Sequence, residues 1–143
     1  MIAKVGEAIV VAHYEAAVAR GSAISAHLPR LRDLALGCEV AQEFGVKKAA
    51  SSAALLLGAE RVVSYDIVPT HEARRLAQEV GPRWSYRIQD SRLAAPTPCD
   101  LLFIDSLHTF AQVAAELNRH ADSVRRWLVF HDTITFGSIG AEG

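Results

Sequence analysis

Short apolar runs alternate along this sequence with longer stretches of helical periodicity, and almost every apolar run ends in or beside an acidic residue. The runs are rich in Val, Leu, Phe and Tyr, a composition typical of buried strands. Strands that alternate with helices of about ten or more residues need crossover connections, and such connections build a parallel sheet. The pattern therefore predicts an α/β fold, a doubly wound parallel sheet of about five strands with helices on both faces.

The apolar and helical segments can be assigned one by one. Strands are predicted over residues 39–45, 61–66, 84–90, 100–105 and 127–132. Helices are predicted over residues 2–19, 29–36, 47–59, 70–81 and 109–124. Thr70 is in position to cap the fourth helix and Gly81 to end it, while Thr109 and Gln112 have the spacing of a capping box.

The chain has 143 residues, which is enough for one domain with a sizeable core. No repeat, low-complexity tract or linker divides it, so residues 1–143 are interpreted as a single domain. Within it, we assign residues 1–37 to N-terminal helices, residues 38–137 to the α/β core and residues 138–143 to a tail.

Composition argues against several classes of partner. The net charge is −1 and the basic residues are scattered, whereas nucleic-acid binding draws on clustered positive charge. No apolar run approaches the roughly 20 residues that span a membrane, and charged residues interrupt the N-terminal segment where a signal peptide needs an apolar region. Cys38 and Cys99 lie too far apart for a zinc motif. We therefore expect reduced thiols in a cytoplasmic protein that binds neither nucleic acid nor membrane.

The ends of the predicted strands carry the candidate functional side chains. The strands finish at or beside Glu43, Asp66, Asp90, Asp105 and the pair His131–Asp132. Parallel strands bring their carboxyl ends to one edge of the sheet, and ligands bind beyond that edge. We therefore expect these side chains to gather on one rim, which is the candidate site.

Asp66 and the loop before it narrow the choice of ligand. An acid at the end of the second strand can bind both hydroxyls of a ribose, in sites for nicotinamide dinucleotides and for S-adenosylmethionine (SAM) alike. A dinucleotide fold needs a G-x-G-x-x-G loop so that the backbone can approach a pyrophosphate, but the loop 45–50 contains only Gly45. The charge of Glu43 would repel a pyrophosphate and suits the sulfonium and ammonium groups of SAM. SAM is therefore favoured.

A family resemblance is carried by two segments, "EFGVKKAASSAALLLGAERVVSYDI" and "DLLFIDSLHTFAQVAAELNRHADSVRRWLVFHDTITFG". Together they resemble class I SAM-dependent methyltransferases. The similarity is greatest to a bacterial group of small-molecule and sugar O-methyltransferases, whose fourth and fifth strands end in IDxxHxY-like and FHDT-like motifs. The resemblance extends over roughly residues 24–137 and implies a Rossmann-like domain that binds SAM.

The resemblance assigns cofactor contacts to the first three strand ends. Glu43 and Gly45 match positions along the methionine moiety, and Ser51 matches a small polar residue where backbone N–H groups of the next helix could hold the SAM carboxylate. Asp66 matches the acid that binds the ribose. Asp90 and Ser91 match positions near the adenine.

The resemblance also assigns the chemistry to the last two strand ends. Asp105 matches the acid that faces the reacting methyl group, and His108 is a candidate general base near the acceptor. In metal-dependent relatives, the acid after strand four and an acidic pair after strand five hold a divalent cation. Asp105, His131 and Asp132 are therefore candidate ligands for Mg²⁺ or Mn²⁺. The SAM sulfonium or a protonated His131 could balance the charge of the two aspartates instead.

Two features depart from the family pattern. Ala49 stands where many members have a second glycine, so either its methyl group crowds the cofactor or the loop takes another path. The chain also ends soon after strand five, without the antiparallel hairpin that closes the sheet in class I methyltransferases. The strand at residues 127–130 is then an open apolar edge, which favours a homo-oligomer unless the N-terminal helix covers it.

The function implied by the resemblance is methyl transfer from SAM to the oxygen of a small hydroxylated or sugar-like acceptor. A shortened, inactive SAM-binding or assembly module is the first alternative, and the early end of the chain favours it. A nicotinamide-dependent oxidoreductase is the second alternative, and the single glycine of the loop 45–50 disfavours it.

Overall fold

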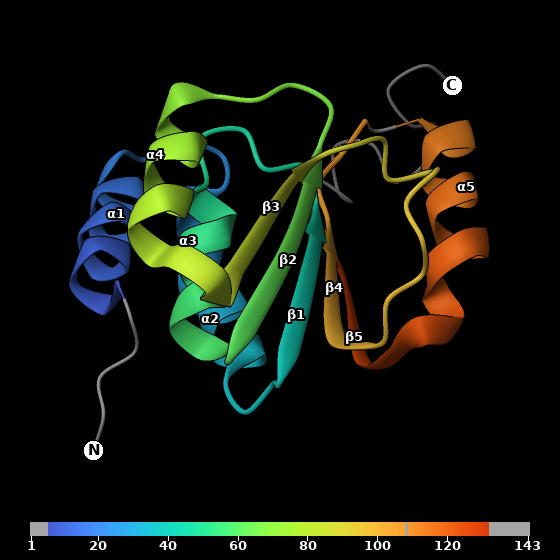
Figure 1. The fold of residues 1–143 in the computed structure, drawn as a ribbon, viewed down its shortest axis with the longest axis horizontal. Helices are drawn as coiled ribbons and strands as arrows, with labels where there is room; N and C mark the ends of the chain where they lie inside the picture. Colours follow the sequence, from blue (N-terminus) through green and yellow to red (C-terminus); the bar gives the residue numbers. More distant parts are fainter. Residues whose placement is uncertain (1–5, 108, 132–143) are drawn as a thin grey trace.

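A computed structural model describes residues 6–107 and 109–131 of the chain. Its centre is a five-stranded, fully parallel sheet in the order β3-β2-β1-β4-β5 (Figure 1). The strands are β1 Val40–Phe44, β2 Arg61–Asp66, β3 Trp84–Ile88, β4 Cys99–Ile104 and β5 Val124–Phe130. The chain runs from β1 outward to β2 and β3, then crosses back to β4 on the other side of β1. This reversal places a topological switch point between β1 and β4.

Helices cover both faces of the sheet, as predicted. One face carries the helices α1 Glu7–Ala19, α2 Leu28–Ala35, α3 Ala50–Gly58 and α4 His71–Val80 (Figure 1). The other face carries α5 Phe110–His120. Three short 3₁₀ helices, Ser25–His27, Gly81–Arg83 and Ala121–Ser123, join neighbouring elements.

Local sequence signals explain where α4 and α5 begin. The hydroxyl of Thr70 accepts a hydrogen bond from the backbone N–H of Ala73 at 3.2 Å, and that of Thr109 accepts from Gln112 at 3.1 Å. Both are N-caps of the predicted kind. The reciprocal half of the predicted capping box is different, because the side chain of Gln112 donates to Ser91 instead.

The end of α5 and the start of β5 differ from the prediction. The helix was expected to continue to residue 124 and the strand to begin at residue 127. The helix instead ends at His120, a 3₁₀ turn follows, and β5 begins at Val124, which pairs with Cys99 of β4. Trp127 pairs with Leu101, and the register is irregular between this pair and the Val124–Cys99 pair. The charged side chains of Arg125 and Arg126 are untypical of a strand, so the sequence did not indicate the start of β5.

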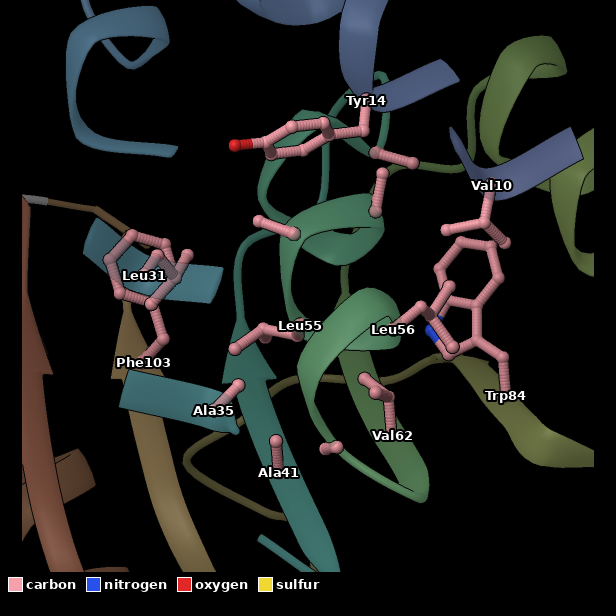
Figure 2. Packing of buried hydrophobic residues seen from close by; sticks show 14 of the residues in the cluster. Val10, Tyr14, Leu31, Ala35, Ala41, Leu55, Leu56, Val62, Trp84 and Phe103 are labelled. Carbon is pink, nitrogen blue, oxygen red and sulfur yellow. The ribbon is translucent and has the colours of Figure 1, made fainter. Parts of the chain in front are cut away.

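The core lies in two layers separated by the sheet. In the larger layer, the sheet packs against α1, α2 and α3. Leu55 and Leu56 of α3 lie near the centre of this layer (Figure 2). The indole of Trp84 closes it on the β3 side. A smaller layer under α5 includes Phe44 and Tyr65. Cys38 and Cys99 are free and buried, and burial raises the pKa of the Cys99 thiol to about 11.

Strand β5 forms an edge of the sheet with apolar side chains on its surface. Trp127, Leu128 and Phe130 are 41%, 41% and 37% exposed, and within residues 6–107 and 109–131 the strand pairs only with β4. Helix α1 packs against α3 and α4, far from β5 (Figure 1). The possibility that the N-terminal helix covers this edge is therefore wrong. Over the same residues, no helix is long and apolar enough to cross a membrane.

We predict that the β5 edge pairs with the same edge of a second copy, because unpaired strand edges with apolar side chains associate. Light scattering should give a dimer or larger species for the unmodified protein. Leu128→Lys should shift it toward the monomer, since a charge on the edge opposes pairing. Ile9→Lys on α1, at a position 43% exposed, is the control and should leave the oligomer intact, because α1 packs against α3 and α4. A monomeric unmodified protein would contradict the prediction.

Candidate functional site

The candidate site lies at the carboxyl ends of the parallel strands, beside the switch point. Glu43 is in β1, Asp66 ends β2 and Asp105 directly follows β4. The order of the strands places β1 between β2 and β4. The sheet thus brings three of the predicted acids to one rim on neighbouring strands.

Gly45 allows the first loop to pass directly over the end of β4. Its φ of +92° lies in the left-handed region, which favours glycine. A Cβ atom at this position would overlap the carbonyl group of Asp105. The Gly45 N–H donates to the Tyr65 carbonyl at 2.9 Å, so this backbone is fixed from β2 as well. Only glycine can adopt this φ readily and also approach the Asp105 carbonyl group this closely.

The rest of the loop takes a strained path. Lys47 and Ala49 have φ values of +52° and +67°, which cost a residue with a side chain roughly 1–2 kcal/mol each. Ala49 is buried at the N-cap of α3 and adopts the left-handed conformation, which favours glycine. The two possibilities raised by the sequence, crowding of the cofactor by the Ala49 methyl group or another path of the loop, stay predictions.

Asp66 holds this loop through backbone hydrogen bonds. One carboxylate oxygen accepts from the N–H groups of Val46 and Lys47 at 2.8 and 2.9 Å. The other accepts from Ile67 and Val68 at 2.8 and 3.3 Å. A carboxylate offers about four acceptor positions, so Asp66 is saturated by its own loops. Its role at a ribose stays a prediction.

Glu43 lies in a cage of serine hydroxyls and has no exposed surface. Ser51 donates to its carboxylate at 2.8 Å and Ser64 at 2.7 Å, and Ser52 donates a third hydrogen bond. The indole N–H of Trp84 donates in turn to the Ser64 hydroxyl at 2.8 Å. The carboxylate is therefore well supplied with donors, none of which carries a charge.

Burial in this cage raises the pKa of the Glu43 carboxyl group. Desolvation raises the pKa of its carboxyl group from 4.5 to about 7, against the opposing effect of the three serine hydroxyls and with a smaller contribution from the charge of Asp105. The group thus changes charge near neutral pH, directly beneath the rim. Its contact with a cofactor stays a prediction.

Ser51 sits in the first turn of α3, as predicted, but its hydroxyl points to Glu43. The helix begins at Ala50 without a side-chain hydrogen bond at its N-cap, Ala49. Backbone N–H groups at a helix N-terminus attract an anionic ligand. The expected contact of this helix with a carboxylate therefore rests on its backbone and stays a prediction.

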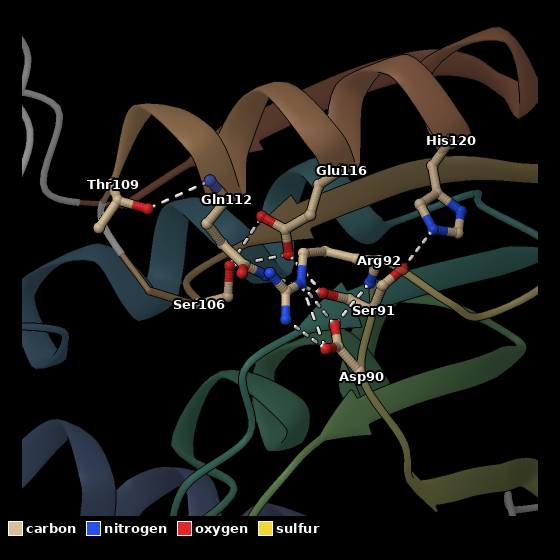
Figure 3. Close-up of polar contacts among 8 residues, drawn as sticks. All are labelled: Asp90, Ser91, Arg92, Ser106, Thr109, Gln112, Glu116 and His120. Carbon is tan, nitrogen blue, oxygen red and sulfur yellow. Dashed lines mark hydrogen bonds and ion pairs between the residues drawn. The ribbon is translucent and has the colours of Figure 1, made fainter.

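Asp90 and Ser91 follow β3 and are both engaged within the protein. Asp90 forms an ion pair with Arg92 at 2.7 Å, and hydrogen bonds from that guanidinium hold the pKa of the Asp90 carboxyl below its ordinary value. Ser91 is buried, and its hydroxyl donates to Glu116 at 2.6 Å (Figure 3). Their roles near an adenine stay predictions.

Asp105 and His131 are brought together by the pairing of β4 with β5. The Nδ1–H of His131 donates to a carboxylate oxygen of Asp105 at 3.1 Å, and their side chains are only 8% and 10% exposed. The His27 ring contacts that of His131 edge-to-face at 5.7 Å between centroids. The two residues are thus paired, as the shared rim predicts.

The predicted metal site is supported by only two of its three residues. Asp132 lies outside the described residues, as does the candidate base His108. Within residues 6–107 and 109–131, no group of three or more His, Cys, Asp or Glu side chains could hold a metal ion. The metal site therefore stays a prediction.

Sequence reasoning missed the internal partners of the site. Ser52 and Ser64 belong to the Glu43 cage, and Glu116 of α5 binds Ser91. A signal for Glu116 was present, because it lies four residues from both Gln112 and His120, along the helix face that packs on the sheet. A polar stripe on a buried helix face indicates a buried network.

The chain resembles known proteins in fold rather than in sequence. No protein-family model matches it, and no curated protein sequence matches it. It is similar to the N-methyltransferase NodS from Bradyrhizobium japonicum WM9 in complex with S-adenosyl-L-homocysteine (SAH), with a TM-score of 0.62 and 20% identity, over 82% of this chain and 67% of that chain.

Two further solved structures are similar to the same extent. Cofactor-bound Rv0187 from MTB gives a TM-score of 0.61 and 24% identity over 92% of this chain and 67% of that chain. The 1,6-didemethyltoxoflavin-N1-methyltransferase of Burkholderia thailandensis, with bound 1,6-didemethyltoxoflavin and SAH, gives 0.59 and 21% over 88% of this chain and 61% of that chain.

These similarities identify the fold. The parallel five-stranded sheet with helices on both faces is the Rossmann-like fold of class I SAM-dependent methyltransferases, as the resemblance implies. This chain spans 61% to 67% of the length of the three similar chains. Among the residues that the structure describes, no antiparallel hairpin extends the sheet beyond β5.

We predict that Gly45→Ala destabilises the protein by more than about 3 kcal/mol, because the added methyl group would displace the backbone of Asp105. Gly37→Ala is a matched control. Gly37 also has a positive φ of 81°, but a Cβ there would meet no atom within 4 Å, so only the backbone cost of about 1 kcal/mol applies. Urea unfolding measures both, and equal losses would refute the steric argument.

We predict that Glu43 makes stability fall as pH rises from about 4.5 to about 7, because the folded state binds its proton more tightly than the unfolded chain does. The loss is complete above pH about 7 and amounts to at most about 3 kcal/mol. Glu43→Gln should remove this component, since the amide stays neutral and matches the carboxyl in shape.

Urea unfolding at a series of pH values, from below 4.5 to above 7, measures the difference between the two proteins. Glu60→Gln, an exposed position, should follow the unmodified protein. Identical pH dependence in the unmodified protein and Glu43→Gln would show that Glu43 titrates in the folded state as it does in the unfolded chain.

Proposed function

We propose that this chain is a SAM-dependent methyltransferase domain that transfers a methyl group to the oxygen of a small hydroxylated or sugar-like acceptor. The observation that carries the proposal is the gathering of Glu43, Asp66 and Asp105 at the switch point of a methyltransferase fold. Open α/β sheets bind their ligands at this place. The acids suit the cationic groups and ribose hydroxyls of SAM.

Several features fit SAM at this rim. The N-terminus of α3 has no side-chain cap, so its backbone N–H groups suit the carboxylate of the methionine moiety. Ile67 and Val68, which directly follow Asp66, are 68% and 61% exposed. Such exposed apolar side chains gain from covering a flat, apolar surface such as the adenine ring.

A ribose at Asp66 replaces hydrogen bonds that are already present. Four backbone N–H groups saturate the carboxylate, so the ribose hydroxyls take the place of the donors from Val46 and Lys47. The first loop then shifts by the small amount that this exchange needs. The strained φ values of Lys47 and Ala49 make such a shift less costly.

Bound SAM supplies an electrophilic methyl group on a sulfonium. The protein residues orient the acceptor and remove its proton. Asp105 with its partner His131 is the buried acid–base pair at the methyl side of the rim, and His108 stays a candidate base. Leu107 and Phe110, which are 56% and 77% exposed and follow Asp105 closely in the sequence, offer an apolar surface for the carbon skeleton of the acceptor.

The proposed mechanism does not depend on a divalent cation, whose third predicted ligand, Asp132, lies outside the described residues. Asp105 and His131 are two ligands, and the described residues bring no third His, Cys, Asp or Glu to them. Both side chains already form a hydrogen bond with each other. The proposal therefore uses the imidazole as the hydrogen-bond partner of Asp105.

A SAM-binding or assembly module without activity is the second candidate. It is favoured by the exposed apolar side chains of the β5 edge, which could serve assembly. A nicotinamide oxidoreductase is disfavoured because the first loop has one glycine and a buried Glu43 beneath it.

Calorimetric titration with SAM, SAH and NADH separates these functions. We expect SAM and SAH to bind and NADH not to bind. Asp66→Ala should weaken SAH binding at least about tenfold, since charge-assisted hydrogen bonds to the ribose are lost. Asp33→Ala, an exposed acid in an ion pair on α2, is the control and should bind SAH normally.

The outcome of the titration decides between the candidates. Binding of SAH together with methyl transfer from SAM to polyol, sugar or phenol acceptors supports the enzyme, and binding without such transfer supports the module. Binding of NADH in preference to SAH would overturn the proposal. Unchanged SAH affinity in Asp66→Ala would remove Asp66 from the ribose site.

A further inference from the structure

Helix α5 presents three polar side chains to the loop that follows β3. Gln112, Glu116 and His120 are four residues apart and lie along one face of the helix (Figure 3). All three contact Ser91. The amide of Gln112 donates to the Ser91 hydroxyl at 3.3 Å, and the Nε2–H of His120 donates to the Ser91 carbonyl at 2.7 Å.

Glu116 extends this contact to a second loop. Its carboxylate accepts a hydrogen bond from the Ser91 hydroxyl at 2.6 Å, and its two oxygens each lie 2.8 Å from the Ser106 hydroxyl (Figure 3). The Glu116 side chain has no exposed surface. One buried carboxylate thus joins the loop after β3 to the loop after β4.

A carboxylate is a costly residue to bury for packing alone. Its desolvation is unfavourable, and the hydroxyl groups that donate to it bring no opposite charge. A well-packed apolar side chain can hold a helix to a sheet without that cost. Unlike an apolar side chain, the carboxylate forms directional hydrogen bonds, which fix two hydroxyl groups at defined positions relative to each other.

The two serines are important because of the residues that precede them. Ser91 follows Asp90 and Ser106 follows Asp105, so an Asp-Ser pair lies in the loop after β3 and another in the loop after β4. In the sheet, β3 and β4 are separated by β2 and β1. No ladder hydrogen bond therefore sets Asp90 directly against Asp105, and Glu116 provides a direct connection between the two loops.

We propose that Glu116 is a positioning residue that fixes the separation of Asp90 and Asp105, and with it the distance between the adenine end and the methyl end of the cofactor site. This inference rests on the proposed function. Glu116 itself does not touch the cofactor. It acts through Ser91 and Ser106, whose hydroxyl groups it holds.

The test compares variants of α5 in the full chain, with SAH and adenosine as calorimetric probes. Glu116→Ala removes both hydrogen bonds, and Glu116→Gln keeps one carbonyl acceptor and the shape. Leu117→Ala removes an apolar side chain of the same helix that packs on the core under α5, so it controls for loss of helix packing. Thermal unfolding confirms that every variant is folded at the titration temperature.

We expect Glu116→Ala to weaken SAH binding at least about tenfold, Glu116→Gln to bind with intermediate affinity, and Leu117→Ala to bind like the unmodified protein. Ser106→Ala removes only the hydrogen bond between Glu116 and the loop that contains Asp105. It should weaken SAH, which spans both ends, more than adenosine, which occupies one end. This split also tests the inference if Glu116→Ala does not fold.

The outcomes distinguish a failure of this inference from a failure of the proposed function. If the Glu116 and Ser106 variants bind SAH as tightly as Leu117→Ala, Glu116 is merely structural and the inference is overturned, while the proposed function stands. If the unmodified protein does not bind SAH, the proposed function fails and the inference fails with it. Affinity that follows the series Ala, Gln, Glu at position 116 supports both.

Discussion

The contact between the Gly45 backbone and the carbonyl group of Asp105 is the constraint on which the rim depends. It fixes how the chain leaves β1, and the N–H of Gly45 binds the backbone of β2 at the same point. The loop then has to turn through the positive φ values of Lys47 and Ala49 before α3 can begin. Asp66 stabilises that turn with its carboxylate. The geometry of the first loop is therefore a consequence of one close approach.

Two buried carboxylates occupy opposite faces of the sheet and are stabilised in the same way. Glu43 faces the layer under α3, Glu116 lies under α5, and each accepts hydrogen bonds from serine hydroxyls. Hydroxyl groups can rotate and satisfy either an ionised or a protonated carboxyl. The Glu43 carboxyl group can therefore remain hydrogen-bonded when it changes charge.

The architecture and the rim acids could be predicted from the sequence, because strand alternation and strand-end acids are local patterns. The limits of β2 and the caps Thr70 and Thr109 agree with the prediction. The serine partners of Glu43 and the bridge from Glu116 could not, since they depend on which faces of α3 and α5 meet the sheet. The start of β5 was missed because its first residues are charged and its pairing with β4 is non-local.

The four backbone donors around Asp66 affect how binding at this rim will appear in calorimetry. A ligand hydroxyl that enters this position exchanges one set of hydrogen bonds for another, so the number of bonds hardly changes and little enthalpy is released. The released N–H groups of the loop return to water, and the loop gains freedom. Under the proposed function, hydrogen bonding at Asp66 would then contribute little enthalpy, and affinity rather than enthalpy would measure how well the site recognises its ligand.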